Sequence, residues 1–248
     1  RYIEPFLGGG AVFFHLSEQM TKQQIPCVIN DINPELVNCY QVVKTQTDDL
    51  ISLLKTHKHD KSYYLEIRNL DRQEGGLSVL NPLERASRFI YLNRTGFNGM
   101  YRVNSKGLNN VPFGRYKNPS IVNEDVLRAS AKALIDTQIS NQSFQDCLSN
   151  ARKGDFVYLD PPYVPLNDTS YFTSYMTNGF TMTDQKSLAK LVIELDKRGV
   201  VFVASNAFLP VVRELYQGFR QIEVKAKRAI NSQGHKRSAI SELLVTNR

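Results

Sequence analysis

The chain has 248 residues, and its 31 lysines and arginines outnumber its 24 aspartates and glutamates, which leaves a formal net charge of +7. Hydrophobic residues at 42% and charged residues at 22% exclude wholesale disorder, and apolar runs no longer than a strand exclude a membrane-spanning helix. Three widely spaced cysteines, with no C-x-x-C pair, argue against a disulfide framework and for a reducing, cytoplasmic compartment. The basic charge favours a polyanionic partner.

The first part of the chain alternates strand-like and helix-like patterns. Residues 2–6 predict a short strand that runs into three glycines, and residues 26–30 predict a second buried strand that ends at Asp31. Asn33 is typical of a helix N-cap, and Pro34 is typical of the first helical position. Because the chain opens directly on a strand, without a methionine, we expect a segment to precede it.

The middle of the chain has a different character. Residues 48–95 predict helices, whereas residues 96–119 are glycine-rich, polar and aromatic. The second stretch predicts a loop and a β-hairpin that turns at residues 105–107. Two interpretations stay open for this part: an ordinary helical insertion and a separate recognition module.

The last part returns to the alternation. Residues 156–159 predict a strand that ends at Asp160, and Thr181 with Asp184 predicts a capping box at the start of a helix. A further strand is predicted at residues 200–204. A terminal antiparallel pair is predicted at residues 219–225 and 239–245. Strands that alternate with helices indicate an α/β fold with a mostly parallel sheet, which binds ligands at the carboxyl ends of its strands.

The first candidate motif is the glycine loop at residues 8–10. Asp31 lies 21 residues after Gly10, about the distance at which a nucleotide-binding unit places a carboxylate on a ribose. Val12 and Phe13 stand where the later glycines of a dinucleotide fingerprint would be. The pattern therefore argues against a dinucleotide and leaves open an adenosine-containing cofactor without phosphates. A tight structural turn is the simpler alternative.

The second candidate motif is Asp160-Pro161-Pro162-Tyr163, directly after a predicted strand. Two prolines make a rigid extended turn, so a carboxylate, a carbonyl oxygen and an aromatic ring are presented together. This set suits a flat base that carries an amino group. A proline turn that merely caps the sheet is the alternative, but the position coincides with the ligand-binding edge of the fold.

In this order, the two motifs resemble those of amino-methyltransferases that depend on S-adenosylmethionine. The middle of the chain and its ending closely resemble the Dam-type DNA adenine-N6 methyltransferases that modify GATC. The segments that carry this second resemblance are residues 93–99, 102–107, 110–117 and 240–247. The resemblance covers nearly the whole chain, but the lysine- and glycine-bearing segment that the family has before its first strand has no match here.

The resemblance implies a Rossmann-like methyltransferase sheet with helices on both faces and a terminal antiparallel strand pair. It implies a catalytic domain, binding S-adenosylmethionine, at residues 1–46 and 125–248. An inserted helical and β-hairpin domain at residues 47–124 would recognise the DNA target.

The resemblance also implies roles for the motif residues. The Asp160 carboxylate and the Pro161 carbonyl would accept the two hydrogens of the target amine, and Tyr163 would stack on the base. The expected catalytic residues are Asp160, Pro161, Pro162 and Tyr163. S-adenosylmethionine is the implied cofactor, and no metal is expected. The expected cofactor-binding residues are Glu4, Pro5, Phe6, Gly8, Gly9, Gly10, Asp31, Ser143, Phe144 and Asp160, with a core aromatic as the alternative for Phe144.

The implied substrate is double-stranded DNA whose target adenine is flipped out of the helix. Arg102 would read a guanine, and Phe97 would insert beside the vacated base. The remaining expected DNA contacts are Arg94, Asn98, Met100, Asn104, Pro112 and Arg115, of which Met100 and Pro112 would meet a thymine methyl. Nonspecific phosphate contacts are expected from Lys225, Lys227, Arg228, Lys236 and Arg237. A solvated surface position is the alternative for each basic residue.

Other functions stay open at this point. The same chemistry could act on cytosine N4 or on a different adenine site, or the chain could be a DNA-binding protein with a relic methyltransferase fold. A metal-dependent nuclease is disfavoured, since the sequence has no cluster of carboxylates or histidines. We expect a monomer in the cytoplasm, associated with the nucleoid through DNA, without membrane contact. A restriction nuclease that acts on the same site, without a stable complex, is a further expected partner.

Overall fold

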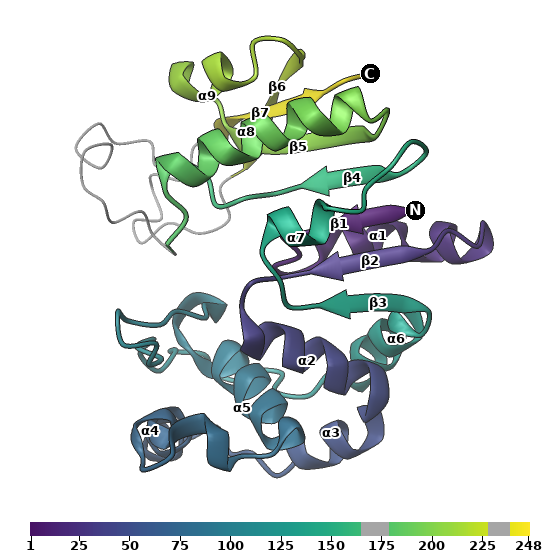
Figure 1. The fold of residues 1–248 in the computed structure, drawn as a ribbon. Helices are drawn as coiled ribbons and strands as arrows, with labels where there is room; N and C mark the ends of the chain where they lie inside the picture. Colours follow the sequence, from purple (N-terminus) through teal and green to yellow (C-terminus); the bar gives the residue numbers. More distant parts are fainter. Residues whose placement is uncertain (165–178, 228–238) are drawn as a thin grey trace. The chain divides into compact units, whose positions relative to one another are not determined.

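The computed structural model describes residues 1–164, 179–227 and 239–248, which divide into two compact units (Figure 1). The first unit comprises Arg1–Phe13, Lys22–Ile32 and Gln142–Arg248. The second comprises Phe14–Thr21 and Asn33–Asn141. Helix α1 (Ala11–Lys22) contributes residues to both.

The described residues form a mixed sheet of seven strands, six of which belong to the first unit in the order β2-β1-β4-β5-β7-β6. These are β1 (Tyr2–Glu4), β2 (Cys27–Asn30), β4 (Phe156–Leu159), β5 (Val201–Ala207), β6 (Arg220–Lys227) and β7 (Ala239–Thr246). Strands β2, β1, β4 and β5 are parallel, whereas β7 runs antiparallel between β5 and β6. The predicted α/β sheet and its terminal antiparallel pair are therefore confirmed.

The helices of the first unit are α7 (Phe144–Leu148), α8 (Met182–Lys197) and α9 (Pro210–Leu215). The predicted capping box opens α8: the Asp184 amide donates to Thr181 Oγ1 over 3.2 Å, and the Thr181 amide donates to Asp184 Oδ2 over 2.7 Å. These bonds satisfy two of the amides that a helix start leaves without partners.

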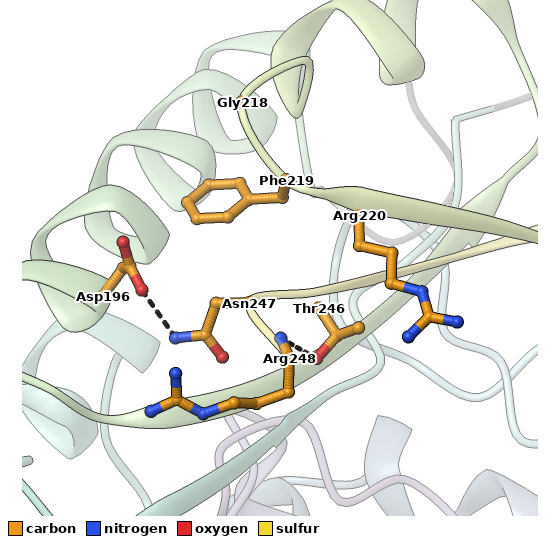
Figure 2. A pocket seen from close by; sticks show the side chains of 7 residues that line it. All are labelled: Asp196, Gly218, Phe219, Arg220, Thr246, Asn247 and Arg248. Atoms are coloured by element: carbon orange, nitrogen blue, oxygen red, sulfur yellow. Dashed lines mark hydrogen bonds between the residues drawn. The ribbon is translucent and has the colours of Figure 1, made fainter.

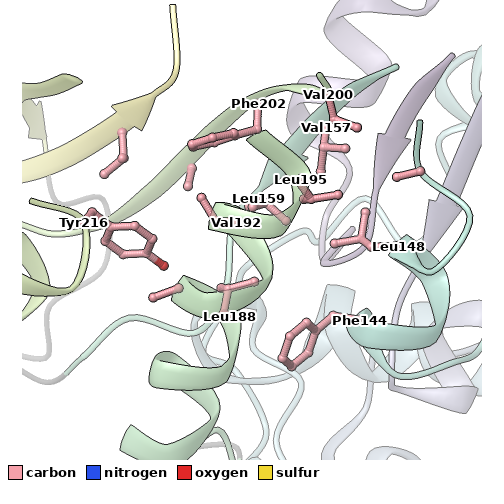
Figure 3. Close-up of a cluster of buried hydrophobic side chains, with 14 of the residues drawn as sticks. Phe144, Leu148, Val157, Leu159, Leu188, Val192, Leu195, Val200, Phe202 and Tyr216 are labelled. Atoms are coloured by element: carbon pink, nitrogen blue, oxygen red, sulfur yellow. The ribbon is translucent and has the colours of Figure 1, made fainter. Parts of the chain in front are cut away.

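The core of the first unit lies between α8 and the sheet (Figure 3). Leu188, Val192 and Leu195 recur at helical spacing and present one apolar face of α8 to β4 and β5. The strands contribute Leu159 and Phe202, both fully buried. Full burial of one such side chain stabilises the fold by about 1.5–3 kcal/mol, so this face fixes α8 against the strands that lead to the second motif.

The second unit is mainly helical. Its elements are α2 (Pro34–Thr45), α3 (Thr47–Leu54), α4 (Lys61–Asn69), α5 (Pro82–Thr95), α6 (Glu124–Leu134), β3 (Thr137–Ser140) and the 3-10 helices Leu70–Arg72, Gly76–Val79 and Phe97–Gly99. Asn33 caps α2 as predicted, since its side chain accepts from the Glu35 amide over 3.0 Å, and Pro34 is the first helical residue. Tyr64, Tyr91 and Leu92 form a buried cluster between α4 and α5. Helix α2 packs against α5 and α6, and all of these helices belong to the second unit.

The expected hairpin reverses the chain, but its pairing is sparse. Only isolated bridges between Val103 and Asn109 and between Gly96 and Phe113 are formed among the described residues. The side-chain oxygen of Asn104 accepts hydrogen bonds from the backbone amides of Lys106 and Leu108, over 2.9 and 3.1 Å. Such local bonds offer the backbone an alternative to a strand ladder, which explains why no regular strands form here.

Candidate active site

Asp160 stands at the carboxyl end of β4, beside β5. The register pairs Leu159 with Ala204, so Asp160 lies next to Ser205. The Ser205 hydroxyl donates to Asp160 Oδ1 over 2.6 Å. Asp160 is exposed whereas Pro161 is buried, and Tyr163 is half-buried. Burial raises the pKa of the Tyr163 hydroxyl, so the ring stays neutral at physiological pH.

The glycine loop after β1 lies beside Asp31 at the end of β2. Gly8 and Gly10 have φ of +50° and +66°, which a glycine adopts without a steric penalty. The Gly10 amide closes the turn on the Leu7 carbonyl over 2.7 Å. The Gly8 amide donates to Asp31 Oδ2 over 2.9 Å. A Cβ at Gly8 or Gly9 would meet nothing within 4 Å, so the loop borders open space.

Glu4 is a buried carboxyl at the carboxyl end of β1. It is 2% exposed, and it accepts a hydrogen bond from the Tyr2 hydroxyl over 2.6 Å. Loss of hydration raises the pKa of Glu4 to about 7, and the negative charge of Asp160 acts in the same direction. Glu4 and Asp160 are therefore electrostatically coupled at one edge of the sheet.

Three phenylalanines gather at the same strand ends. The ring centroids of Phe6 and Phe144 lie 5.4 Å apart, and Phe180 lies 5.7 and 5.8 Å from the two. Phe144 is the first residue of α7, and β3 stops earlier, at Ser140. The Ser143 hydroxyl caps α7 by accepting from the Asp146 amide over 3.1 Å. The sequence interpretation did not include Phe180, because this residue belongs to no recognisable sequence motif.

A buried asparagine that the sequence interpretation missed joins two of these segments. Asn30 donates to the Pro5 carbonyl and to the Gln142 carbonyl, each over 3.0 Å, and accepts from the Gln142 amide over 2.9 Å. It therefore ties the glycine loop to the residues before α7. An asparagine at the end of an apolar strand was the only available signal.

Most of the residues expected to contact DNA lie between residues 94 and 115, in the second unit. Phe97 is 40% exposed, and Met100 is half-buried. The exposed ones are Arg94, Asn98, Arg102, Asn104, Pro112 and Arg115. Arg102 Nε donates to Asn110 Oδ1 over 2.7 Å, which orients the guanidinium. Lys225 is exposed on β6, while Arg228, Lys236 and Arg237 lie outside the described residues.

Residues 96–115 (the 96–115 segment) are anchored by a buried polar network that the sequence interpretation missed. Asp71 Oδ2 accepts from the Asn109 amide over 2.7 Å and forms an ion pair with Arg88 at 2.9 Å. The Tyr64 hydroxyl donates to the Val111 carbonyl over 2.9 Å. Arg88 also donates to backbone carbonyls at the end of α4, so α4 and α5 together fix the backbone of the segment.

Comparison with known proteins decides the family. A model described as D12 class N6 adenine-specific DNA methyltransferase matches residues 1–230. The chain belongs to this family. The protein is therefore an enzyme that methylates adenine N6 in DNA, with S-adenosylmethionine as methyl donor.

Curated relatives agree over nearly full length. The methyltransferase is 43% identical to type II methyltransferase M1.LlaDCHI of Lactococcus lactis subsp. cremoris, over 100% of this chain and 86% of the relative. It is 42% identical to type II methyltransferase M.MjaIII of Methanocaldococcus jannaschii, over 100% of this chain and 88% of the relative. The DNA adenine methylase of Escherichia coli K12 is 36% identical to this chain, over 98% of this chain and 84% of the relative.

The strand ends of the methyltransferase fit this cofactor. The glycine loop borders open space, the Asp31 carboxylate stands beside it, and the Phe6 and Phe144 rings offer an apolar surface. No group of three or more possible metal ligands occurs in residues 1–164, 179–227 and 239–248. Among the same residues, no helix has the length and apolar character that a membrane crossing requires.

A separate pocket of about 260 Å³ lies at the other end of the sheet (Figure 2). It is lined by Asp196, Gly218, Phe219, Arg220, Thr246, Asn247 and Arg248. Thr246 ends β7, which is antiparallel to β5, so the pocket lies at the amino ends of the parallel strands. Ligands of parallel sheets bind at the carboxyl ends, which separates this pocket from the methyltransferase motifs.

Proposed function

We propose that the methyltransferase acts on adenine within GATC in double-stranded DNA and that Asp160-Pro161-Pro162-Tyr163 carries the chemistry. The observation that supports this most is the place of Asp160: it is exposed, it follows a central parallel strand, and Ser205 holds one of its oxygens. The resemblance of residues 93–117 to Dam-type enzymes supports the GATC sequence.

The proposed mechanism relies on positioning. The amino nitrogen of adenine is a poor nucleophile because its lone pair is delocalised into the ring. The Asp160 carboxylate and the Pro161 carbonyl accept its two hydrogens and draw the nitrogen toward tetrahedral geometry, which frees the lone pair for in-line attack. The cofactor supplies a methyl group already activated on a sulfonium. Tyr163 stacks on the base, and no covalent intermediate with the protein is formed.

Cofactor binding is assigned to the strand ends of the first unit. Asp31 holds the ribose hydroxyls, and residues 6–10 line the methionine moiety. Phe144 contacts the adenine ring, with Ser143 beside it as the cap of α7. Glu4 and Pro5 complete the proposed site as the residues that lead into the loop.

DNA recognition is assigned to residues 47–124, within a catalytic frame of residues 1–46 and 125–248. The target base leaves the helix, at a cost of a few kcal/mol that stacking on Tyr163 and insertion of Phe97 offset. Arg102 reads a guanine by a bidentate contact. Met100 and Pro112 meet a thymine methyl. Phosphate contacts come from Arg94, Asn98, Asn104 and Arg115, which fix the register.

Further proposals concern the setting of the reaction. We propose a monomer that associates with the nucleoid through DNA. We also propose that a restriction nuclease recognises the same site without forming a stable complex with this chain. The type II methyltransferases among the relatives support that pairing.

The test uses labelled S-adenosylmethionine and two duplexes, one with GATC and one with the same bases scrambled. Label should appear only as N6-methyladenine and only in the GATC duplex. Asp160→Ala should lose methyl transfer and keep most DNA affinity. Equal labelling of both duplexes would refute the GATC assignment, and an Asp160→Ala enzyme with a near-normal rate would refute the role of Asp160.

A further inference from the structure

The Asp160–Tyr163 loop (residues 160–163) cannot hold its own shape through backbone pairing. Pro161 and Pro162 have no amide hydrogen, so neither can donate to a neighbouring strand. Asp160 is exposed, and the loop lies beyond the last register pair of β4, Leu159 with Ala204. The conformation of the loop must therefore be fixed by side chains from other elements.

A buried pair of amides meets this need. Gln185, on the first turn of α8, donates from Nε2 to the Pro162 carbonyl over 2.8 Å. Its Oε1 accepts from Asn206 Nδ2 over 3.0 Å. Asn206, in β5, then accepts from the Val164 amide over 3.4 Å and from the Ala207 amide over 2.8 Å. Gln185 is 0% exposed and Asn206 is 1% exposed, so water does not compete for these bonds.

The direction of this chain of hydrogen bonds is set by the backbone. The Pro162 carbonyl can only accept, and the amides of Val164 and Ala207 can only donate. Gln185 must therefore turn its NH₂ group to Pro162 and its oxygen to Asn206. Both side-chain amides have a fixed orientation, and together they span the backbone from Pro162 to Val164.

The neighbour of Asn206 acts on the other end of the same loop. Ser205 is 3% exposed, and its hydroxyl donates to Asp160 Oδ1 over 2.6 Å. The Leu159 carbonyl lies 3.3 Å from the same hydroxyl. Two consecutive residues of β5 thus flank the loop: Ser205 bonds to the Asp160 carboxylate, and Asn206 bonds to the backbone amide of Val164, the residue after the loop.

We propose that Gln185, Asn206 and Ser205 are positioning residues for methyl transfer, which hold the Asp160 carboxylate and the Pro161 carbonyl at the spacing that the target amine requires. This inference rests on the proposed role of the loop. Ser205 fixes Asp160 Oδ1, which leaves Oδ2 to meet the amine. Gln185 fixes the Pro162 carbonyl, which belongs to the peptide after the one that carries the Pro161 carbonyl, and so limits how far the loop can move around Pro161.

The test compares Gln185→Met with Gln221→Met. Gln221 is the control, because its side-chain amide also donates to the backbone, to the Arg213 and Tyr216 carbonyls over 2.9 and 3.1 Å, but lies on β6 away from the loop. For Gln185→Met, kcat should fall by about 10- to 100-fold, while the Kd values for S-adenosylmethionine and for the GATC duplex stay within about twofold. For Gln221→Met, kcat should stay within about twofold.

A second comparison uses a milder change. Ser205→Ala removes the hydroxyl, whereas Ser205→Thr keeps it. The alanine variant should lose about 10-fold or more in kcat, and the threonine variant should recover most of that loss. This pair decides the question alone if Gln185→Met does not fold.

The outcomes separate the two proposals. If Asp160→Ala is inactive while Gln185→Met and Ser205→Ala turn over normally, the positioning role is wrong and the role of the loop stands. A fall in substrate affinity without a fall in kcat would also overturn the positioning role. If Asp160→Ala itself keeps a near-normal rate, the proposed function fails first.

Discussion

The backbone amide of Gly8 donates to Oδ2 of Asp31 over 2.9 Å, which links the turn after β1 to the carboxyl end of β2. Hydrogen bonds to a charged group contribute about 1.5–3 kcal/mol. Asp31→Ala should therefore loosen the turn, remove the proposed ribose acceptor, and weaken S-adenosylmethionine binding by about 10-fold or more. Calorimetric titration with the cofactor measures this. Asp136→Ala, at an exposed position, is the control, and equal affinity in the two variants would contradict the role of Asp31.

The buried carboxyl of Glu4 makes stability depend on pH. Its pKa is about 7 in the fold against an ordinary 4.5, so between these values the folded chain keeps a proton that the unfolded chain releases. The contribution of Glu4 is thus fully present below pH 4.5 and is lost as the pH rises through 7. Glu4→Gln has no such loss and should exceed the wild type in stability by up to about 3 kcal/mol above pH 7.

Urea unfolding of the wild type and of Glu4→Gln at several pH values measures this difference. Glu66→Gln, at an exposed position in the second unit, is the control and should show no such dependence. A difference between Glu4→Gln and the wild type that does not change with pH would argue against a raised pKa.

The Asp71–Arg88 pair should matter far more than a surface pair. Both side chains are nearly buried, at 5% and 4% exposed. Asp71→Ala leaves the Arg88 charge buried without its carboxylate and should cost about 3–5 kcal/mol. It also frees the Asn109 amide, so DNA affinity should fall. Asp48→Ala breaks an exposed pair with Arg128 and should cost about 0–1 kcal/mol. Equal stability losses in denaturant unfolding would contradict this account.

Arg102 and Arg115 should affect DNA binding in different ways. The wild type should bind the GATC duplex more tightly than a duplex in which the guanine is replaced. Arg102→Ala should reduce this difference in binding free energy by about 1–3 kcal/mol. Arg115→Ala should weaken binding to both duplexes equally and lower the slope of log K against log salt by about 0.9. Binding isotherms on both duplexes at several salt concentrations test this. An unchanged specificity ratio in Arg102→Ala would assign Arg102 to the phosphates.

Many helix and strand boundaries could be predicted from the sequence, because the residues that mark them lie close together in the chain. Asn33 with Pro34 marks the start of α2, and Thr181 with Asp184 marks the start of α8, since a cap and its helix lie within a few residues. The position of Asp160 directly after a strand could be predicted from the short apolar run that precedes it.

The supports of the site could not be predicted in the same way. Asn30 bonds to Gln142, which lies 112 residues further along the chain. Gln185 stands on the buried face of α8, where periodicity alone favours an apolar residue. A single polar side chain inside an apolar pattern shows that a partner is needed, but the partner is defined only once the strands are in register.

The 96–115 segment is held mainly through its backbone. Val111 is bound at its carbonyl by Tyr64, and Asn109 is bound at its amide by Asp71. Neither contact depends on which side chain the segment carries at those positions. Under the proposed role of Arg102 in reading DNA, exposed residues of this segment can be exchanged without loss of the anchor, so a new target sequence can arise on an unchanged scaffold.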